Sequence, residues 1–250
     1  MPTPVTAGVH RLGDSTVNFY LLQEGTDLTV VDAGLPAHYA QLAALLAGIG
    51  RSVRDVRAVL LTHGHLDHVG LAERIRREAA ATVWVHELDA PALAAPRRPA
   101  SGARPEGRLG RYLLRRPAAL ATPVHLARAG AFRTPAVGTA SHLRAGSTLD
   151  VPGRPRAIEV PGHTPGSVAF HLPAQGAVLT GDALVTRDSL AGRTGPTIVC
   201  AAFTHDTAQA LSALESLVPL DAALVLPGHG DPYEHGISKA VRQARQAGAS

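Results

Sequence analysis

Three histidines and an aspartate lie within six positions of the stretch LLTHGHLDHVG, which spans residues 60–70: His63, His65, Asp67 and His68. Imidazoles this close would repel one another when protonated and would compete for the same hydrogen-bond partners when neutral. A cation between them removes this conflict, because neutral imidazole nitrogen and ionised carboxylate oxygen are ligands of zinc, iron and manganese. The cluster therefore predicts one half of a metal site.

Three later segments place a further potential ligand directly after an apolar, strand-like stretch. RAIEV leads into PGHTPGS with His163, AVLT leads into GDAL with Asp182, and AALVL leads into PGHGDP with His229. Groups that follow strands gather at one edge of an α/β sheet, where such folds collect their functional residues. A simple turn is the default interpretation of any one of these loops. That default weakens because four separate strands end at a potential ligand.

The elements that must position these loops form two similar halves with a basic block between them. In the first half, strands are expected at 16–23, 28–32, 58–62 and 82–86, with helices at 36–50 and 69–79. In the second half, strands are expected near 147–151, 156–160, 167–172, 177–180 and 222–226, with helices near 205–217 and from about 234. Strands mixed with helices in this rhythm predict sheets covered by helices.

The length and composition are typical of a globular enzyme-sized domain. At 250 residues the chain can bury a large core, and 45% hydrophobic with 18% charged residues is ordinary for a soluble protein. The stretch MPTPVTAGVHRLG lacks the apolar centre of a signal peptide, and no apolar run is long enough to span a bilayer. We therefore expect a cytoplasmic protein without a membrane partner. The single Cys200 excludes an intrachain disulfide and a cysteine-based zinc finger.

Basic residues are concentrated between the two halves. Residues 97–146 hold a single acid, Glu106, and ten arginines, so the block carries +9 and leaves −5 on the rest of a chain whose net charge is +4. The arginines are at positions 97, 98, 104, 108, 111, 115, 116, 128, 133 and 144. Because 96–146 is poorly periodic, we predict an inserted segment there that folds over the metal cleft as a lid. Its arginines would bind an anionic substrate or simply form a solvated surface.

Five motifs resemble, in their order along the chain, those of the metallo-β-lactamase superfamily. They are Asp32 in VVDAG, HGHLDH at 63–68, His163 in PGHTPGS, Asp182 in TGDAL and His229 in PGHG. The resemblance implies an α/β fold, a four-layer αβ/βα sandwich formed by one domain over residues 1–250. It also implies a metal-dependent hydrolase with two divalent metal ions at the sheet edges.

The resemblance assigns seven residues to the metals. One metal would be held by three histidines, the second by an aspartate and two histidines, and a further aspartate would bridge them. In that order, these residues are His63, His65, His163, Asp67, His68, His229 and Asp182. Asp32 would not bind metal but would steady the histidine loop. Zinc is the expected metal, and iron or manganese also suits these ligands.

Two neighbouring cations favour hydrolysis. A water molecule between them would have its pKa lowered toward roughly 7, while either cation polarised a carbonyl or phosphoryl oxygen of the substrate. Asp67 and Asp182 are the expected catalytic carboxylates, and the leaving group would be stabilised by the second metal or protonated by solvent or Asp67. Arg193, in the RTGP stretch after Asp182, is a candidate substrate contact, although a turn explains the Gly-Pro pair equally well.

The absence of a cysteine from the motifs makes the site resemble the glyoxalase II type of thioester hydrolase and its lactonase and phosphodiesterase relatives. We therefore expect a small-molecule substrate with an activated acyl bond, a thioester or a lactone, which could be anionic. The short stretch after GHGDPY argues against glutathione specificity. Phosphodiester or RNA cleavage is one alternative, although nucleic acid is a less expected partner because there is no room for a large extra domain. An iron-dependent persulfide dioxygenase is the other, and a non-catalytic binding protein is least expected.

Overall fold

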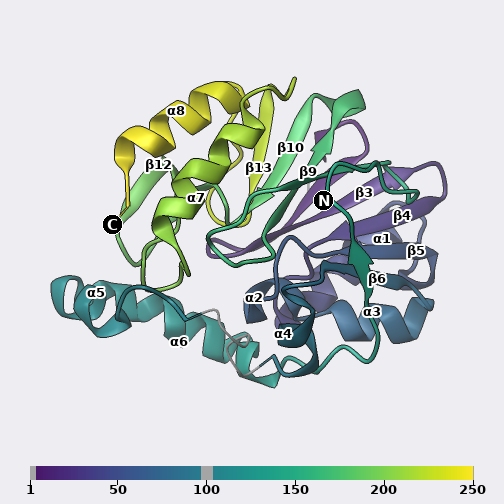
Figure 1. Ribbon diagram of the computed structural model, residues 1–250. Helices are drawn as coiled ribbons and strands as arrows, with labels where there is room; N and C mark the ends of the chain where they lie inside the picture. Colours follow the sequence, from purple (N-terminus) through teal and green to yellow (C-terminus); the bar gives the residue numbers. More distant parts are fainter. Residues whose placement is uncertain (1–3, 97–103, 250) are drawn as a thin grey trace.

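Two β-sheets pack face to face in the computed structural model, which describes residues 4–96 and 104–249 (Figure 1). The first sheet has its strands in chain order: β1 (Pro4–Thr6), β2 (Val9–Gly13), β3 (Asn18–Glu24), β4 (Asp27–Val31), β5 (Val56–Leu60), β6 (Thr82–His86) and β7 (Ser141–Leu143). The second sheet has the order β13 (Leu224–Pro227), β10 (Ala177–Gly181), β9 (Val168–Leu172) and β8 (Arg156–Glu159). A separate hairpin joins β11 (Val185–Asp188) to β12 (Arg193–Thr197).

Helices cover the outer face of each sheet (Figure 1). The first sheet is covered by α1 (Tyr39–Gly48) and α3 (Ala72–Ala79), and the second by α7 (Thr207–Ala213) and α8 (Ile237–Ala247). Short helices follow β5 and β6, namely α2 (Leu66–Val69) and α4 (Ala90–Ala94). The layers are therefore helix, sheet, sheet and helix, which confirms the predicted αβ/βα sandwich.

The sequence of α8 shows why such a helix forms and which face it buries. Ile237, Ala240, Val241 and Ala244 are buried, at spacings of three and four residues that bring them onto one side of a helix. They pack with Val225 and other residues of the second sheet. The intervening polar residues face solvent, so the amphipathic pattern fixes the orientation of the helix.

Strand β3 shows how a sheet in the middle of the sandwich buries both faces. Phe19 and Leu21 pack toward the helices of the first half, whereas Tyr20 and Leu22 pack between the two sheets. Successive side chains of a strand point to opposite faces, so this strand reads as a continuous apolar run. Phe170 of β9 meets the same inter-sheet layer from the other side.

The strand directions bring the motif loops to a common edge. Strands β4, β5, β6 and β7 are parallel neighbours in the first sheet, and β10 and β13 are parallel neighbours in the second. The carboxyl ends of β5, β10 and β13 therefore open toward one cleft. The strand predicted at 147–151 is reduced to an isolated bridge between Thr148 and Arg156, next to which the backbone N–H of Leu149 donates to the carbonyl of Pro155.

A helical arm, residues 104–133, lies between α4 and β7 in the chain and contacts both halves. It contains α5 (Leu109–Arg115), the 3-10 helix Pro117–Leu120, α6 (Ala121–Arg128) and the 3-10 helix Ala131–Arg133. In Figure 1 it lies along the bottom left, beneath the ends of the sheets. The segment predicted as inserted, 96–146, thus also includes the edge strand β7, which belongs to the first sheet. Arg97 and Arg98 lie outside the described residues.

The hairpin of β11 and β12 was not predicted from the sequence. Its strands are short, and Gly192 and Gly195 adopt positive φ angles within it. Across 4–96 and 104–249, no helix combines the length and the apolar character that crossing a membrane requires.

Candidate metal centre

The seven predicted ligands lie together, on loops that follow four strands. His63 and His65 follow β5, and α2 begins directly after His65, so that Asp67 and His68 project from its first turn. His163 lies between β8 and β9, Asp182 follows β10, and His229 follows β13. The extended backbone of His65, with φ −75° and ψ 153°, marks the point where the loop turns into the helix.

Close backbone approach holds these loops together at glycines. A Cβ built on Gly228 would lie 2.3 Å from Oδ1 of Asp182 and 2.8 Å from Cε1 of His68. Gly181 has φ +49°, and a Cβ there would meet Oγ1 of Thr62 at 2.4 Å. Any larger residue at either position would push the loops of the two halves apart.

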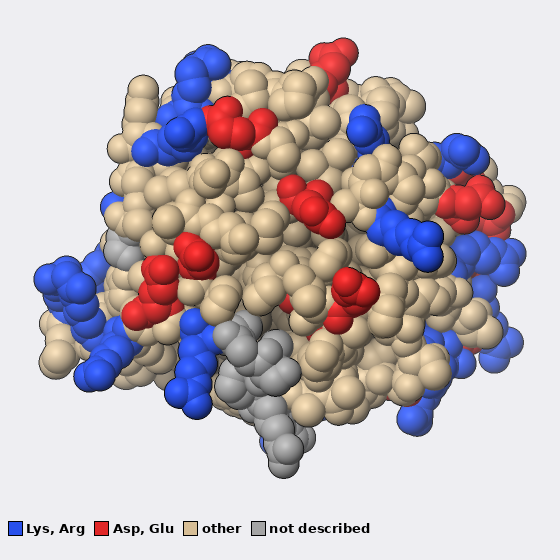
Figure 2. Space-filling view, viewed as in Figure 1, with Lys and Arg blue, Asp and Glu red and all other residues tan. Residues whose placement is uncertain are grey.

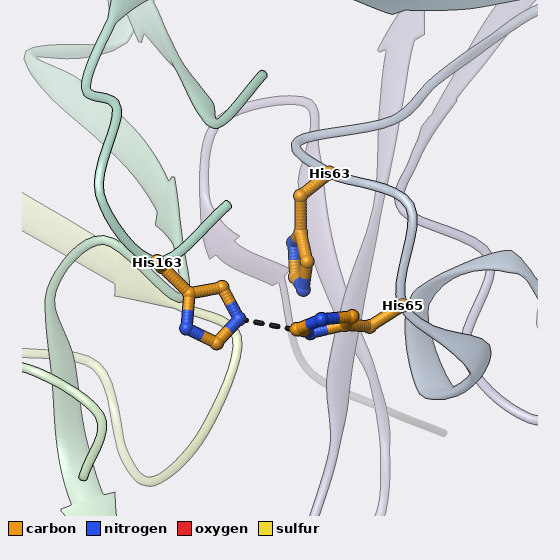
Figure 3. Close-up of side chains that lie close together, drawn as sticks. All are labelled: His63, His65 and His163. Carbon is orange, nitrogen blue, oxygen red and sulfur yellow. Dashed lines mark hydrogen bonds between the residues drawn. The ribbon is translucent and has the colours of Figure 1, made fainter. Parts of the chain in front are cut away.

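Three histidine rings converge on one point (Figure 3). Nε2 of His163 lies 3.0 Å from Nδ1 of His65, and the ring of His63 is centred 4.7 Å from each of the other two rings. One nitrogen from each ring lies within 4.8 Å of the others. A single cation at the centre could therefore contact all three.

A second group lies beside the first and shares Asp182 with it. Asp67, His68 and His229 place ligand atoms within 4.8 Å of one another, and so do His63, His68 and Asp182. Oδ2 of Asp182 lies 3.0 Å from Nε2 of His229 and 3.4 Å from Nε2 of His163, while Oδ1 lies 3.5 Å from Nε2 of His68. Asp182 is therefore the one carboxylate that faces both groups among the predicted ligands.

Several ligand atoms of this cluster are buried without a hydrogen-bond partner among the described residues. They are Nε2 of His63, Nε2 of His68 and Oδ1 of Asp182. An unsatisfied buried polar atom costs about 1–3 kcal/mol, so a cluster of them calls for an additional partner. Imidazole nitrogens and carboxylate oxygens suit a divalent cation, and the cluster fits the two metals implied by its sequence motifs.

Asp32 orients His68 from outside the cluster. Its carboxylate accepts hydrogen bonds from Nδ1 of His68 at 2.9 Å and from the backbone N–H of Thr62 at 2.8 Å. Because Nδ1 is occupied, Nε2 of His68 must face the cluster. This position outside the ligands fits the role that the motif predicts for Asp32.

His229 is oriented in the same way by the backbone. Its Nδ1 donates a hydrogen bond to the carbonyl of Thr16, which directs Nε2 toward Asp182 and Asp67. Thr16 lies in the loop between β2 and β3, so the first half positions a ligand that the second half supplies.

Burial and charge move the pKa values of the cluster in opposite directions. Burial lowers the pKa values of His63 and His163 well below the ordinary value and favours their neutral, ligand form. Burial also acts to lower the pKa of His68, but the carboxylates around it, led by Asp182, raise that pKa to about 10. The pKa of His229 is raised to about 9, where Asp182 again outweighs burial. Asp182 thus stabilises the protonated, positively charged form of His68 and His229. A metal ion at this place would supply the positive charge instead.

Asp89 joins the loops of the two halves and was missed in the sequence. Its buried carboxylate accepts from the backbone N–H of Gly64 at 2.8 Å, from Oγ1 of Thr164 at 2.8 Å and from the N–H of Gly166 at 3.0 Å. Gly64 separates His63 from His65, and Thr164 follows His163. Asp89 comes shortly after the end of β6, so the signal that found the ligands, a carboxylate beyond a strand, could have found it too.

A cavity of about 430 Å³ opens over this cluster. Its floor is formed by the potential ligands His65, Asp67, His163, Asp182 and His229. Apolar side chains from the arm and from the second half also line it. Chemistry and substrate binding can therefore occupy adjacent parts of a single cavity.

The positions of the described arginines agree with a solvated surface, one of the two alternatives that the sequence left open. The described arginines of the basic block are exposed, and none of them lines the cavity. Figure 2 shows basic side chains gathered at the lower left, over the outer end of the arm. Arg193 donates to the carbonyls of Ala247 and Gly248 at the end of α8, because β12 packs against that helix. Arg187 of β11 is the arginine that lines the cavity among the described residues.

Comparisons with known proteins agree with this architecture. The family model described as "Metallo-beta-lactamase superfamily" matches residues 12–229. The chain is 27% identical to the probable metallo-hydrolase YflN of Bacillus subtilis (strain 168), over 90% of this chain and 84% of that protein.

Two solved structures share the fold at the same level of identity. The metallo-beta-lactamase family protein TTHA1429 from Thermus thermophilus is 27% identical with a TM-score of 0.69, covering 95% of this chain and 78% of that one. TTHA1623, described in a di-iron-bound form, is 27% identical with a TM-score of 0.63, covering 95% and 96%.

Proposed function

Because the chain belongs to the metallo-β-lactamase superfamily and is a metal-dependent hydrolase, we propose that it cleaves an activated acyl bond, a thioester or a lactone, at a two-metal centre. The observation that carries the proposal is the pair of ligand groups that share Asp182 and leave buried ligand atoms unsatisfied. An acyl substrate suits the cavity because its walls are largely apolar.

Each of the two groups of ligands would hold one metal ion. The three-histidine group would hold one ion and the group of Asp67, His68 and His229 the other, with Asp182 between them. Zinc is our first choice, and iron is supported by the di-iron form described for TTHA1623. When bound, the metals lower the pKa of water toward about 7 and polarise the substrate carbonyl.

The protein's own groups position and shield this chemistry. Asp32 and the Thr16 carbonyl fix the rings of His68 and His229, so their Nε2 atoms need no reorganisation when a substrate arrives. Asp182 is only 5% exposed, and its burial limits competition from bulk water. Asp67, whose side chain is 17% exposed, lies at the cavity and is the carboxylate best placed to meet a leaving group.

The surface around the cavity favours a small acyl substrate over a nucleic acid. A nucleic acid backbone requires several cations, and the described arginines of the basic block are exposed and do not line the cavity. Arg187 can bind one anionic group near the floor, which keeps a singly charged acyl substrate compatible with the site. The two complete ligand groups also favour hydrolysis over the single-metal oxygenase alternative.

A panel of substrates tests this proposal. Metal-loaded protein would be assayed with thioesters, lactones, β-lactams and phosphodiesters, beside the variants Asp67→Ala and Asp150→Ala. Asp150 has a fully exposed side chain outside the cavity and serves as the matched control. We expect turnover of an acyl substrate that falls more than about tenfold in Asp67→Ala and is unchanged in Asp150→Ala. Turnover confined to phosphodiesters would overturn the acyl assignment.

A further inference from the structure

Two of the four phenylalanines are left exposed by the fold, and both line the cavity. Phe132 is 59% exposed and Phe203 is 40% exposed, whereas Phe19 and Phe170 are fully buried. A phenylalanine gains stability from burial, so the core gives no reason for either exposed ring. Exposed apolar side chains that gather around one cavity mark a binding site for an apolar group.

The two rings reach the cavity from different parts of the molecule. Phe132 belongs to the 3-10 helix Ala131–Arg133 at the end of the arm, and Phe203 lies between β12 and α7 in the second half. Leu109 of α5, Leu126 of α6 and Val199 line the same cavity. The apolar wall therefore depends on the arm and the second half coming together.

Contacts at both ends hold the arm in place as a roof. The N–H groups of Glu106 and Gly107 donate to the carbonyls of Thr204 and Ala201, at 3.0 and 2.7 Å. The carbonyl of Ala129 accepts from the N–H of Ala37 in the first half, at 3.2 Å. Apolar clusters accompany these bonds, with Leu190 and Cys200 under α5 and with Val17 and Leu35 under α6.

We propose that the apolar wall of the cavity binds the hydrocarbon chain of the substrate, so that the enzyme selects acyl groups by length. The apolar wall begins beside the floor, and Leu66, between the ligands His65 and Asp67, lines the cavity too. A volume of about 430 Å³ is within the range of sites for small organic ligands. The identity of the bond that is cleaved rests on the function proposed above, but the binding of the chain does not.

The proposal gives a quantitative expectation for chain length. Each methylene transferred from water to an apolar site favours binding about fourfold. The value of kcat/KM should therefore rise about fourfold per methylene along a series of linear acyl thioesters, until the cavity is filled. Because the chain binds away from the reacting atoms, the gain should appear mainly in KM.

The test combines hydrolysis with a binding measurement that needs no reaction. Linear acyl thioesters of N-acetylcysteamine, from acetyl to decanoyl, serve as substrates, and the matching S-alkyl thioethers serve as unreactive ligands for calorimetry. Both series would be measured on wild-type protein, Phe132→Ala, Phe203→Ala and Leu114→Ala. Leu114 is the control, since it lies on the same arm, is 87% exposed and does not line the cavity.

Phe132→Ala and Phe203→Ala should each weaken binding of the decyl thioether about tenfold and leave the acetyl thioester nearly unaffected. Leu114→Ala should match wild type. Binding that does not depend on chain length, or an equal loss in Leu114→Ala, would overturn the proposal. Chain-dependent binding of the thioethers without thioester hydrolysis would instead support the chain site and count against the acyl function.

Discussion

The floor and the roof of the cavity are built in opposite ways. The floor consists of buried and partly buried polar groups on short loops at strand ends, held by glycines that allow almost no other side chain. The roof consists of half-exposed apolar side chains on the helical arm, which contacts each half through a few bonds and small clusters. A rigid floor preserves ligand geometry, whereas a roof of this kind can change without disturbing it. The difference assigns chemistry to the floor and choice of substrate to the roof.

Substitution of a residue of the floor should reduce the turnover of every substrate alike. Asp182→Ala is the substitution with the largest expected effect. Asp182 faces both ligand groups, so its loss should lower the metal content to about one ion or less per chain and turnover by about a thousandfold. Elemental analysis and steady-state kinetics would measure both effects. Activity within tenfold of wild type, on any substrate, would remove Asp182 from the centre.

Asp89 tests whether the floor depends on bonds that do not touch a ligand side chain. We expect Asp89→Ala to weaken metal binding about 10- to 100-fold, because the N–H groups of Gly64 and Gly166 lose their acceptor. Asp89→Asn keeps one oxygen and should recover part of this loss. Metal affinities from competition with a chelator would separate the two variants. Wild-type affinity in Asp89→Ala would contradict this role of the hydrogen bonds, and wild-type affinity in Asp89→Asn alone would show a purely steric role.

The roof should respond more weakly and only in substrate binding. Nε2 of His125 on α6 lies 2.7 Å from Oδ2 of Asp14. The same oxygen lies 3.0 Å from Nε2 of His38. Removing this half-exposed contact in His125→Ala should raise KM about two- to fivefold for long acyl chains, with kcat and metal content unchanged. A loss of metal in this variant would show that roof and floor are not independent.

The smallest effect is expected from Glu73 of α3, which holds the segment that leads from the arm back to the first sheet. Hydrogen bonds from Arg76 and from the N–H of Gly138 hold the pKa of Glu73 at about 2, below its ordinary value of 4.5. The ionised carboxylate therefore stabilises the fold above about pH 4.5, and this contribution is lost as the pH falls toward 2. Glu73→Gln should lower the free energy of unfolding by about 1 kcal/mol at pH 7, after allowance for the exposure of the arginines. The loss should be smaller at pH 3. Urea unfolding at both values measures the change, and a penalty that grew on acidification would contradict the ionised state.

The sequence predicted the floor far better than the roof. Ligands such as His163 and Asp182 follow apolar strands. Such strands can be recognised from the local sequence pattern alone, without knowledge of the rest of the fold. The short helices of the arm each pack on a different surface, so no single apolar period runs through 96–146. Phe132 and Phe203 become neighbours of one cavity only through tertiary folding. The direction in which the arginines point depends on the same packing, and charge alone does not determine it.

Metal stoichiometry tests the central claim, a two-metal floor, most directly. Wild-type protein loaded with excess zinc or iron and then desalted should contain about two ions per chain. Asp67→Ala, which leaves the three-histidine group intact, should contain about one, and Asp150→Ala should contain about two. A wild-type value that stays at one ion per chain, unchanged in Asp67→Ala, would contradict the two-metal centre and the mechanism built on it.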